Sequence, residues 1–429
     1  MNSGFENASN CDVSKAFRLD APPDAMTMIG GKSYVYFGGD GYLGLQADPN
    51  MISVACNAAL KYGLGAATSR NCYTAAPVQE VEKNAALFLG TEKAYYTLDE
   101  ANIADLFLLS LSGVFERAFV DETALPFWNA RFQRLNGISA DGAGVGLNKK
   151  ELVSFKHGDP NSLREKLEKE LRIDERPLLI TDGISANFGS IAPLREYENV
   201  LDGFGESSML IDDSHGIGVL GLHGRGTLEF YDFNLTSVNQ TGRELSFGPH
   251  SEPLDLDFNS DSASNAKSEN DSSSKVNIYM FASLAKAVGG FGVIAAGSEL
   301  FIDKLVEYNQ NSYAVPPNSI AAATAYSISQ LDKKRRERNR LQENIRYLRS
   351  GLRKLGFVVE ESPSPVVAIQ VGTIQNMRRI HAELELDRVL TSFLPVKYND
   401  ARGVIRIAVF ASHTCETIDM LLSSLKRVL

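Results

Sequence analysis

The sequence has few cysteines, a deficit of positive charge and no long apolar run. None of the four cysteines, Cys11, Cys56, Cys72 and Cys415, has the spacing of a disulfide framework or a metal site. No stretch approaches the roughly 18 consecutive apolar residues that a membrane helix needs. The first residues lack the basic and apolar blocks of a secretory signal. We therefore expect a cytoplasmic protein with no membrane span and no metal site.

The charge balance argues against a nucleic-acid partner. The net charge is -10, and the largest basic cluster is the run KKRRERNR at residues 333–340. This run lies in a helical pattern, so we interpret it as a solvent-exposed helix face. With 429 residues, 44% hydrophobic and 22% charged, the chain has the composition of a globular protein. At roughly 150 residues per domain, about two or three structural units are expected.

From residue 80 onward, short apolar runs alternate with amphipathic stretches, a pattern typical of a parallel sheet covered by helices. The predicted class is therefore α/β, with a mainly parallel sheet in its large domain. Because such sheets carry ligands at the carboxyl ends of their strands, the polar residue that ends each run is a candidate site residue. The predicted strands are 118–121, 178–182, 208–213 and 277–283, and a helix over 160–173 follows a cap at Asn161 or Ser162.

Composition divides the chain into parts. We expect an N-terminal arm over residues 1–50, a large domain over 51–300 and a small C-terminal α+β domain over 301–429. The small domain is predicted to contain a helix over 319–355, strands over 366–371 and 404–410, and a closing helix over 416–429. Residues 237–275 are rich in Ser, Asn and Asp and poor in apolar residues, which predicts a disordered insertion in the large domain. An acidic interaction segment or a phosphorylated loop is the alternative.

The stretch MLIDDSHGIGVLGLHGRG, residues 209–226, is the most informative. An apolar strand ends at Asp212, and His215 follows before a glycine-rich turn. This order places an acid and an imidazole at the ligand-carrying edge of the sheet. The alternative is a structural turn with an aspartate cap.

A second stretch, YMFASLAKAVGGFGVIAAGS, runs from a strand into Ser283 and then Lys286. The residues around Lys286 are Ala, Val and Gly, an apolar setting that favours a Schiff-base lysine. The alternative is an ordinary surface lysine. An acid about seventy residues before a lysine, both at strand ends, is the arrangement that a pyridoxal phosphate enzyme requires, because the acid keeps the pyridine nitrogen protonated.

At this point the chain resembles the α-oxoamine synthases of the fold-type I pyridoxal phosphate enzymes. The resemblance spans about Tyr36 to Val428 apart from the insertion. It is carried, in order, by the segments FGGDGYLGLQADP, GLGAATSRN, SFKHGDPNSLREKL, TDGISANFGSIAPL, IDDSHGIGVLGLHGRG, SLAKAVGGFGVIAAGS, AVPPNSIAAA and VIRIAVFASHT.

The resemblance implies a fold-type I transferase fold, pyridoxal 5'-phosphate as cofactor and a homodimer. It implies that Lys286 forms the Schiff base, that Asp212 pairs with the pyridinium nitrogen and that His215 hydrogen-bonds the phenolic oxygen. Ser283 would contribute to a cradle for the cofactor phosphate.

The rest of that cradle would be the turn formed by Thr97, Leu98 and Asp99, near a helix start. The resemblance also implies that Arg406 binds the substrate carboxylate through its guanidinium fork. A salt-bridged arginine of an edge strand is the alternative for Arg406.

The chain departs from the family pattern around the substrate. Leu125 stands where a histidine stacks on the cofactor ring and touches the substrate carboxylate, and Asp40 stands where an asparagine is usual. Phe127 or Trp128 could supply an aromatic face instead, although both are more often core residues. Two further departures are Ala186 for a serine and Val78 for a histidine.

The function implied is the decarboxylative condensation of a small amino acid with an acyl-CoA thioester, giving an α-aminoketone. Two alternatives stay open. The first is another pyridoxal phosphate reaction on the same scaffold, such as transamination, decarboxylation or condensation with an acyl donor other than CoA. The second is a regulatory subunit, against which the retention of Lys286 speaks.

Overall fold

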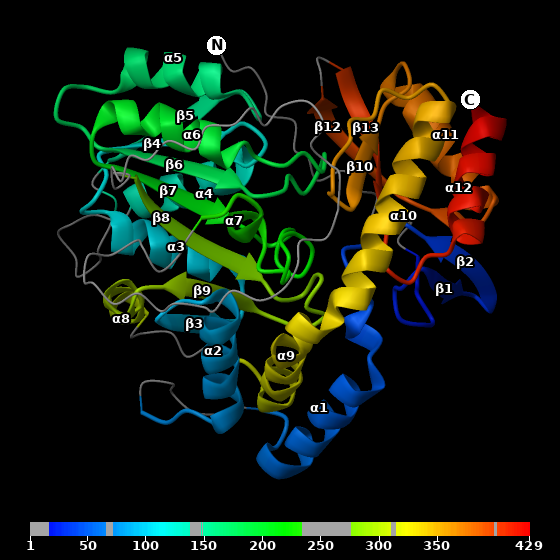
Figure 1. The fold of residues 1–429 in the computed structure, drawn as a ribbon, viewed down its shortest axis with the longest axis horizontal. Coiled ribbons are helices and arrows are strands. Elements are labelled where there is room, and N and C mark those ends of the chain that lie inside the picture. Colours follow the sequence, from blue (N-terminus) through cyan, green and yellow to red (C-terminus); the bar gives the residue numbers. More distant parts are fainter. Residues whose placement is uncertain are drawn as a thin grey trace.

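The computed structural model describes residues 17–65, 72–137, 147, 149–233, 276–309, 315–398 and 401–429. They form a large lobe around a seven-stranded sheet and a second lobe that contains two three-stranded sheets. Figure 1 shows the long helix α10 running along the second lobe, and α1 projecting from the base of the molecule. The predicted insertion lies outside the described residues.

The elements of the large lobe alternate between strands and helices, as the sequence pattern predicts. Its strands are β3 (Lys93–Thr97), β4 (Arg117–Asp121), β5 (Glu151–Phe155), β6 (Pro177–Asp182), β7 (Ser207–Asp212), β8 (Val276–Ser283) and β9 (Val293–Gly297). Its helices are α2 (Ala76–Leu89), α3 (Glu100–Leu111), α4 (Leu125–Asn136), α5 (Pro160–Glu170), α6 (Leu194–Leu201), α7 (Thr227–Phe230) and α8 (Glu299–Tyr308), with a 3-10 turn η3 (Asp202–Phe204).

The remaining elements come from both ends of the chain. The strands are β1 (Met26–Ile29), β2 (Lys32–Tyr36), β10 (Val366–Ile369), β11 (Val389–Leu390), β12 (Ser392–Tyr398) and β13 (Ala401–Ala408). The helices are α1 (Pro49–Tyr62), α9 (Asn318–Gln330), α10 (Arg335–Lys354), α11 (Ile374–Leu386) and α12 (Cys415–Val428), with 3-10 turns η2 (Leu45–Ala47) and η4 (Leu331–Lys334).

The large sheet has the order β3-β9-β8-β7-β6-β4-β5 and is parallel except for β9, which is antiparallel to both of its neighbours. The four predicted strands are therefore confirmed as β4, β6, β7 and β8. Successive residues of a strand point to opposite faces of the sheet. Accordingly, Leu179 and Met209 join one hydrophobic core, whereas Leu178 and Leu210 join the other. Burial on both faces explains why these strands read as continuous apolar runs.

The second lobe combines distant parts of the sequence. β2 pairs with β1 and, in parallel, with β11, whereas β13 lies between β10 and β12. The predicted N-terminal arm thus shares a sheet with a strand of the predicted C-terminal domain. The domain boundaries at residues 50 and 300 stay predictions.

Two local predictions are wrong, and a third holds except at one residue. The helix expected over 319–355 is two helices, α9 and α10, separated by the 3-10 turn η4. The cap of α5 is Asp159, whose carboxylate accepts from the N–H groups of Asn161 and Ser162, because a residue before the helix must satisfy its first donors. The basic run is largely solvent-exposed, as predicted, but Arg338 within it is buried and donates to the carbonyl of Leu331 at 2.6 Å.

Candidate active site

Lys286 lies in a tight turn that follows β8. The turn is closed by hydrogen bonds from the N–H of Leu284 to the carbonyl of Gly292 and from the N–H of Gly290 back to Leu284, each 2.8 Å long. Gly292 has a φ of +83°, and a Cβ there would lie 2.5 Å from the carbonyl oxygen of Thr97. Only glycine lets this turn approach the end of β3. The Lys286 side chain is 15% exposed, and its Nζ lies 3.4 Å from Oε1 of Glu100.

Asp212 ends β7, and Asp182 ends the neighbouring strand β6 in register with it. Burial and the charge of Asp212 raise the pKa of Asp182 well above its usual range. Burial also raises the pKa of Asp212, but the charge of Lys286 and the N–H of Ser214, 2.9 Å from Oδ1, act against this rise. Asp212 is therefore the better site for the negative charge of the pair. No ion pair joins Asp212 to a cation among the described residues.

Asp213 is the next residue and faces away from this edge. Its carboxylate accepts from the backbone N–H of Thr227 at 2.8 Å and from the hydroxyl of the same residue. Burial raises the pKa of Asp213 to about 7. A Cβ at Gly226 would lie 2.0 Å from this carboxylate, so the glycine-rich turn is what leaves room for it.

His215 is buried beside Tyr42, whose hydroxyl oxygen lies 2.6 Å from its Nδ1. Burial and the nearby charge of Lys286 lower the pKa of His215 well below its usual range, so the ring is neutral at pH 7. Burial raises the pKa of Tyr42 well above 10, so its hydroxyl keeps its proton. When Tyr42 donates to Nδ1, the hydrogen of the neutral ring is on Nε2, which makes Nε2 a donor.

Arg406 extends from the central strand of the small sheet β10-β13-β12 toward the large lobe. Its Nε donates to the carbonyl of Ala186 at 2.7 Å, and its Nη1 lies 3.4 Å from the carbonyl of Gly39. Its Nη2 forms an ion pair with Oδ1 of Asp40 and lies 3.4 Å from the hydroxyl of Tyr42. The Arg406 side chain is only 7% exposed. Arg406 thus joins the two lobes.

The expected phosphate turn lies between β3 and α3. Thr97 is buried, and its hydroxyl accepts from Nδ2 of Asn102 at 3.0 Å. Asp99 is the N-cap of α3 and accepts from the N–H of Asn102 at 2.7 Å. Ser283 ends β8 at the same edge of the sheet, since β3 and β8 run in the same direction. The turn therefore brings hydroxyl groups and a helix start together, with the carboxylates of Asp99 and Glu100 beside them.

Leu125 is the first residue of α4 and packs, half-buried, against the core that α3, α4 and α8 share. Trp128 is buried in that core, edge-on to Phe281 with ring centroids 6.2 Å apart. Phe127 is 37% exposed and packs at right angles to Trp128. Trp128 is accordingly a core residue. Val78, the other apolar replacement, is buried in the opposite core.

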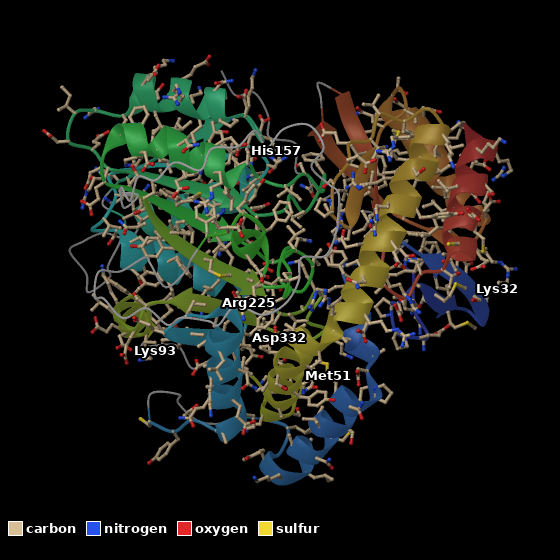
Figure 2. All side chains as sticks on the ribbon, viewed as in Figure 1. Lys32, Met51, Lys93, His157, Arg225 and Asp332 are labelled. Atoms are coloured by element: carbon tan, nitrogen blue, oxygen red, sulfur yellow. The ribbon has the colours of Figure 1, made fainter. Side chains whose placement is uncertain are left out.

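A second polar cluster joins the end of β4 to the loops that follow β5 and β6. Nδ1 of His157 lies 2.9 Å from Oδ2 of Asp121, at the end of β4, and its Nε2 contacts the hydroxyl of Ser190. Burial raises the pKa of Asp121, but the interaction with His157 and the hydrogen bonds from Thr123 together outweigh this effect, so the pKa is lowered. In Figure 2, His157 lies on the side of the large lobe nearer to the second lobe. The cluster fixes the loop that presents the carbonyl of Ala186 to Arg406.

The structure thus brings the predicted residues to one edge of the large sheet, with Arg406 and Asp40 reaching it from the second lobe. Sequence reasoning missed three members of this group. Asp182 ends an apolar run in the same way as Asp212, a signal that was available. Tyr42 lies within the Tyr-Leu-Gly-Leu segment, but nothing in the sequence pairs it with His215. Glu100 had no signal beyond its place at the start of α3.

Comparison with known families decides the classification. The profile of a family described as aminotransferase class I and II matches residues 143–425, which is more than half of the chain. This chain belongs to that family. Within the family, the chain is similar to 8-amino-7-oxononanoate synthase of Methylococcus capsulatus, with 28% identity over 95% of this chain and 92% of the relative. It is also similar to serine palmitoyltransferase of Bacteriovorax stolpii, with 26% identity over 96% and 86%. The resemblance to the α-oxoamine synthases is thereby confirmed.

Solved structures support the same fold within this aminotransferase family. Serine palmitoyltransferase of Sphingomonas wittichii matches with a TM-score of 0.77 and 21% identity, covering 96% of this chain and 92% of its own. A structure of SPT with PLP matches with a TM-score of 0.76 and 22% identity over the same shares. The predicted fold class is confirmed. In the described part of the chain, no helix is long and apolar enough to span a membrane, and no cluster of His, Cys, Asp or Glu is suited to a metal.

Proposed function

We propose that this protein is a pyridoxal 5'-phosphate-dependent acyltransferase of the α-oxoamine synthase type. It would join a small amino acid to an acyl-CoA thioester, with release of CO2 and free CoA, and form an α-aminoketone. The observation that carries the proposal is the convergence of Lys286, Asp212 and His215 at one sheet edge. Relatives named as 8-amino-7-oxononanoate synthase and serine palmitoyltransferase, which match over almost the whole chain, support it.

The residues present fit pyridoxal phosphate. Asp212 is a partly buried carboxylate with no ion-paired cation among the described residues, which suits a pyridinium nitrogen. His215 has a neutral ring whose Nε2 can donate to a phenolic oxygen. Lys286 offers an amine between these groups and the phosphate turn. When bound, the cofactor supplies an electron sink for the charge that develops at the substrate α-carbon.

Lys286 has two tasks in this proposal. Its Nζ holds the cofactor until the amino substrate replaces it, and it then moves the proton at the substrate α-carbon. For both tasks, Nζ must leave its contact with Glu100, an ion pair with a half-exposed carboxylate that is weak in water.

Asp212 and its neighbours act through electrostatics. The negative charge of Asp212 stabilises a protonated ring nitrogen, and a neutral Asp182 beside it avoids a second buried charge. Ser283 and the turn of Thr97, Leu98 and Asp99 would hold the phosphate through hydroxyl and N–H groups. Because the Asp99 carboxylate already accepts one N–H of α3, the turn offers less to an anion than an uncapped helix start.

The second candidate is a different pyridoxal phosphate reaction on the same scaffold. It is favoured by one observation, the occupation of the Arg406 guanidinium by Asp40, together with Leu125 in place of an imidazole. Both changes concern the group that would hold the substrate carboxylate. A regulatory subunit is a weaker candidate, because Lys286, Asp212 and His215 are all retained.

We further propose that the protein works in the cytoplasm as a homodimer, as the resemblance implies. Exposed apolar side chains on α1 and α2 support an interface there: Leu60 is 88% exposed and Leu87 is 67% exposed. Sedimentation at micromolar concentration measures this directly. A monomer would contradict the dimer without affecting the assigned chemistry.

The decisive assay supplies an amino acid with and without acyl-CoA thioesters of graded chain length. Release of both CO2 and free CoA only when both substrates are present supports the condensation. Exchange of the amino group onto a keto acid, without release of free CoA, would favour the second candidate. Lys286→Ala serves as the inactive control.

A further inference from the structure

The protein itself already engages the guanidinium of Arg406. Each of its three nitrogens has a protein acceptor: the carbonyl of Ala186 for Nε, the carbonyl of Gly39 for Nη1, and Asp40 for Nη2. With the side chain only 7% exposed, little of the fork faces outward. A substrate carboxylate that approaches Arg406 therefore meets an arginine whose charge is already balanced.

The Asp40 carboxylate is ionised, and one of its two oxygens can accept a further hydrogen bond. Burial raises its pKa, but the charge and hydrogen bond of Arg406, with smaller contributions from His215 and Lys286, together outweigh this effect, so the pKa lies below its usual range. Arg406 donates to Oδ1, and the hydroxyl oxygen of Tyr42 lies 3.2 Å from the same atom. Oδ2 accepts none from the residues that the structure describes, and the side chain is 37% exposed.

These two observations disfavour an amino acid with an alkyl side chain and favour one whose side chain carries a hydrogen-bond donor. An α-carboxylate placed at Arg406 would lie beside the Asp40 carboxylate, and like charges at such distances repel. Leu125 provides no hydrogen bond that could compensate. A hydroxyl or an ammonium on the substrate, in contrast, can donate to Oδ2 of Asp40, and a charge-assisted hydrogen bond of this kind is among the stronger ones.

We propose that Asp40 sets the amino-acid specificity of this site, which selects substrates whose side chain ends in a hydroxyl or an ammonium group over those with a plain alkyl side chain. The inference rests on the proposed function only in placing the amino acid between Lys286 and Arg406. Asp40 acts here as a contact to the substrate, and its pairing with Arg406 lowers the affinity for the carboxylate that all amino acids share.

The test uses two matched pairs of ligands that differ in one terminal group. L-serine is compared with L-alanine, and L-2,4-diaminobutyrate with L-norvaline, on the protein loaded with pyridoxal phosphate and without any acyl thioester. Binding is read from the change in visible absorbance and from the shift in the thermal unfolding midpoint. We expect the donor-bearing member of each pair to bind about tenfold more tightly, the effect of one charge-assisted hydrogen bond. Equal affinity within both pairs, measured on the unmodified protein, would overturn the proposal.

Two variants locate the effect. In Asp40→Asn, the preference within each pair should shrink, and L-alanine should bind more tightly than to the unmodified protein, because Arg406 regains an unbalanced charge. Glu361→Gln, which removes an exposed carboxylate paired with Arg353, should change neither quantity. Unchanged L-alanine binding in a folded Asp40→Asn protein would exclude this role. Absence of any amino-acid binding would instead contradict the proposed function, so the two failures are distinguishable.

Discussion

The two sides of the candidate site differ in how far they follow the family pattern. The cofactor side, with Asp212, His215 and Lys286, has every residue that the resemblance implies, and the structure gathers them at the ends of β7 and β8. The substrate side has Leu125 in place of a histidine and Asp40 in place of an asparagine. On the cofactor side the chemistry is retained, whereas on the substrate side the binding groups have changed.

This difference teaches that reaction type and substrate choice rest on separate physical elements. The cofactor side lies at the ends of two adjacent buried strands and in the short turns that follow them, where a changed side chain would disturb tight packing. On the substrate side, Asp40 in the loop after β2 and Arg406 on β13 are distant in sequence and meet only in the tertiary structure. Substitutions there change charge and shape without disturbing the large sheet.

The largest expected effect comes from Lys286→Ala, which removes the amine on which the cofactor side depends. Activity should fall by at least about a thousandfold, because the covalent step and the proton transfer are lost together. The residual rate and the visible absorbance after cofactor addition measure this. Borohydride reduction of the unmodified protein, followed by peptide mapping, should label Lys286. Lys426→Ala, at the end of α12, is the control, and a label on any other lysine would refute the assignment.

The second test of the cofactor side is Asp212→Asn. It keeps the size of the side chain but removes the charge that stabilises the protonated ring nitrogen. Turnover should fall by on the order of a hundredfold or more, the scale of lost preorganised charge stabilisation. Steady-state kinetics and the thermal unfolding midpoint separate chemistry from folding. A fully active variant would show that the cofactor side is not built around this carboxylate.

Asp213→Asn tests the cost of a buried acid next to the cofactor side, where Asp213 contacts Thr227. The pKa of Asp213 is about 7 in the folded protein and about 3.9 in the unfolded chain. The unfolded chain therefore loses this proton first, so this group lowers the free energy of unfolding as pH rises from about 4 to 7. Asparagine does not ionise, and the variant should lose less stability over that range, by on the order of a few kcal/mol. The free energy of unfolding, measured with denaturant at pH 5 and pH 8, tests this prediction. An equal change between the two pH values in the variant and in the unmodified protein would contradict it.

The smallest effect is expected on the substrate side, from Leu125→His. If Leu125 has only removed a polar contact, the histidine should strengthen the binding of glycine, alanine or serine by about 1 to 3 kcal/mol. Absorbance titration of the loaded protein measures this change. Loss of activity would instead show that the pocket has been rebuilt around an apolar group, which would favour the second candidate reaction.

The local sequence pattern was sufficient to predict the strands of the large sheet. It was insufficient to predict where some helices begin and end or which charged side chains are buried. The strands β6, β7 and β8 were predicted to within about one residue, since burial on both faces leaves an uninterrupted apolar run. The break between α9 and α10 was missed because no glycine or proline marks it. Arg338 reads as one more exposed charge, and only its bond to the carbonyl of Leu331 within the folded protein explains its burial.

By itself, the sequence determined the α/β class, the strand ends at Asp212 and Ser283, and the lysine that follows them. These features depend on apolar periodicity and on neighbours close in the chain. Only the tertiary structure decided that Asp40 neutralises Arg406, that Tyr42 orients His215 and that Asp182 lies beside Asp212. Each of these pairs joins residues that are distant in sequence, and their energetics depend on burial and distance, which no local pattern records.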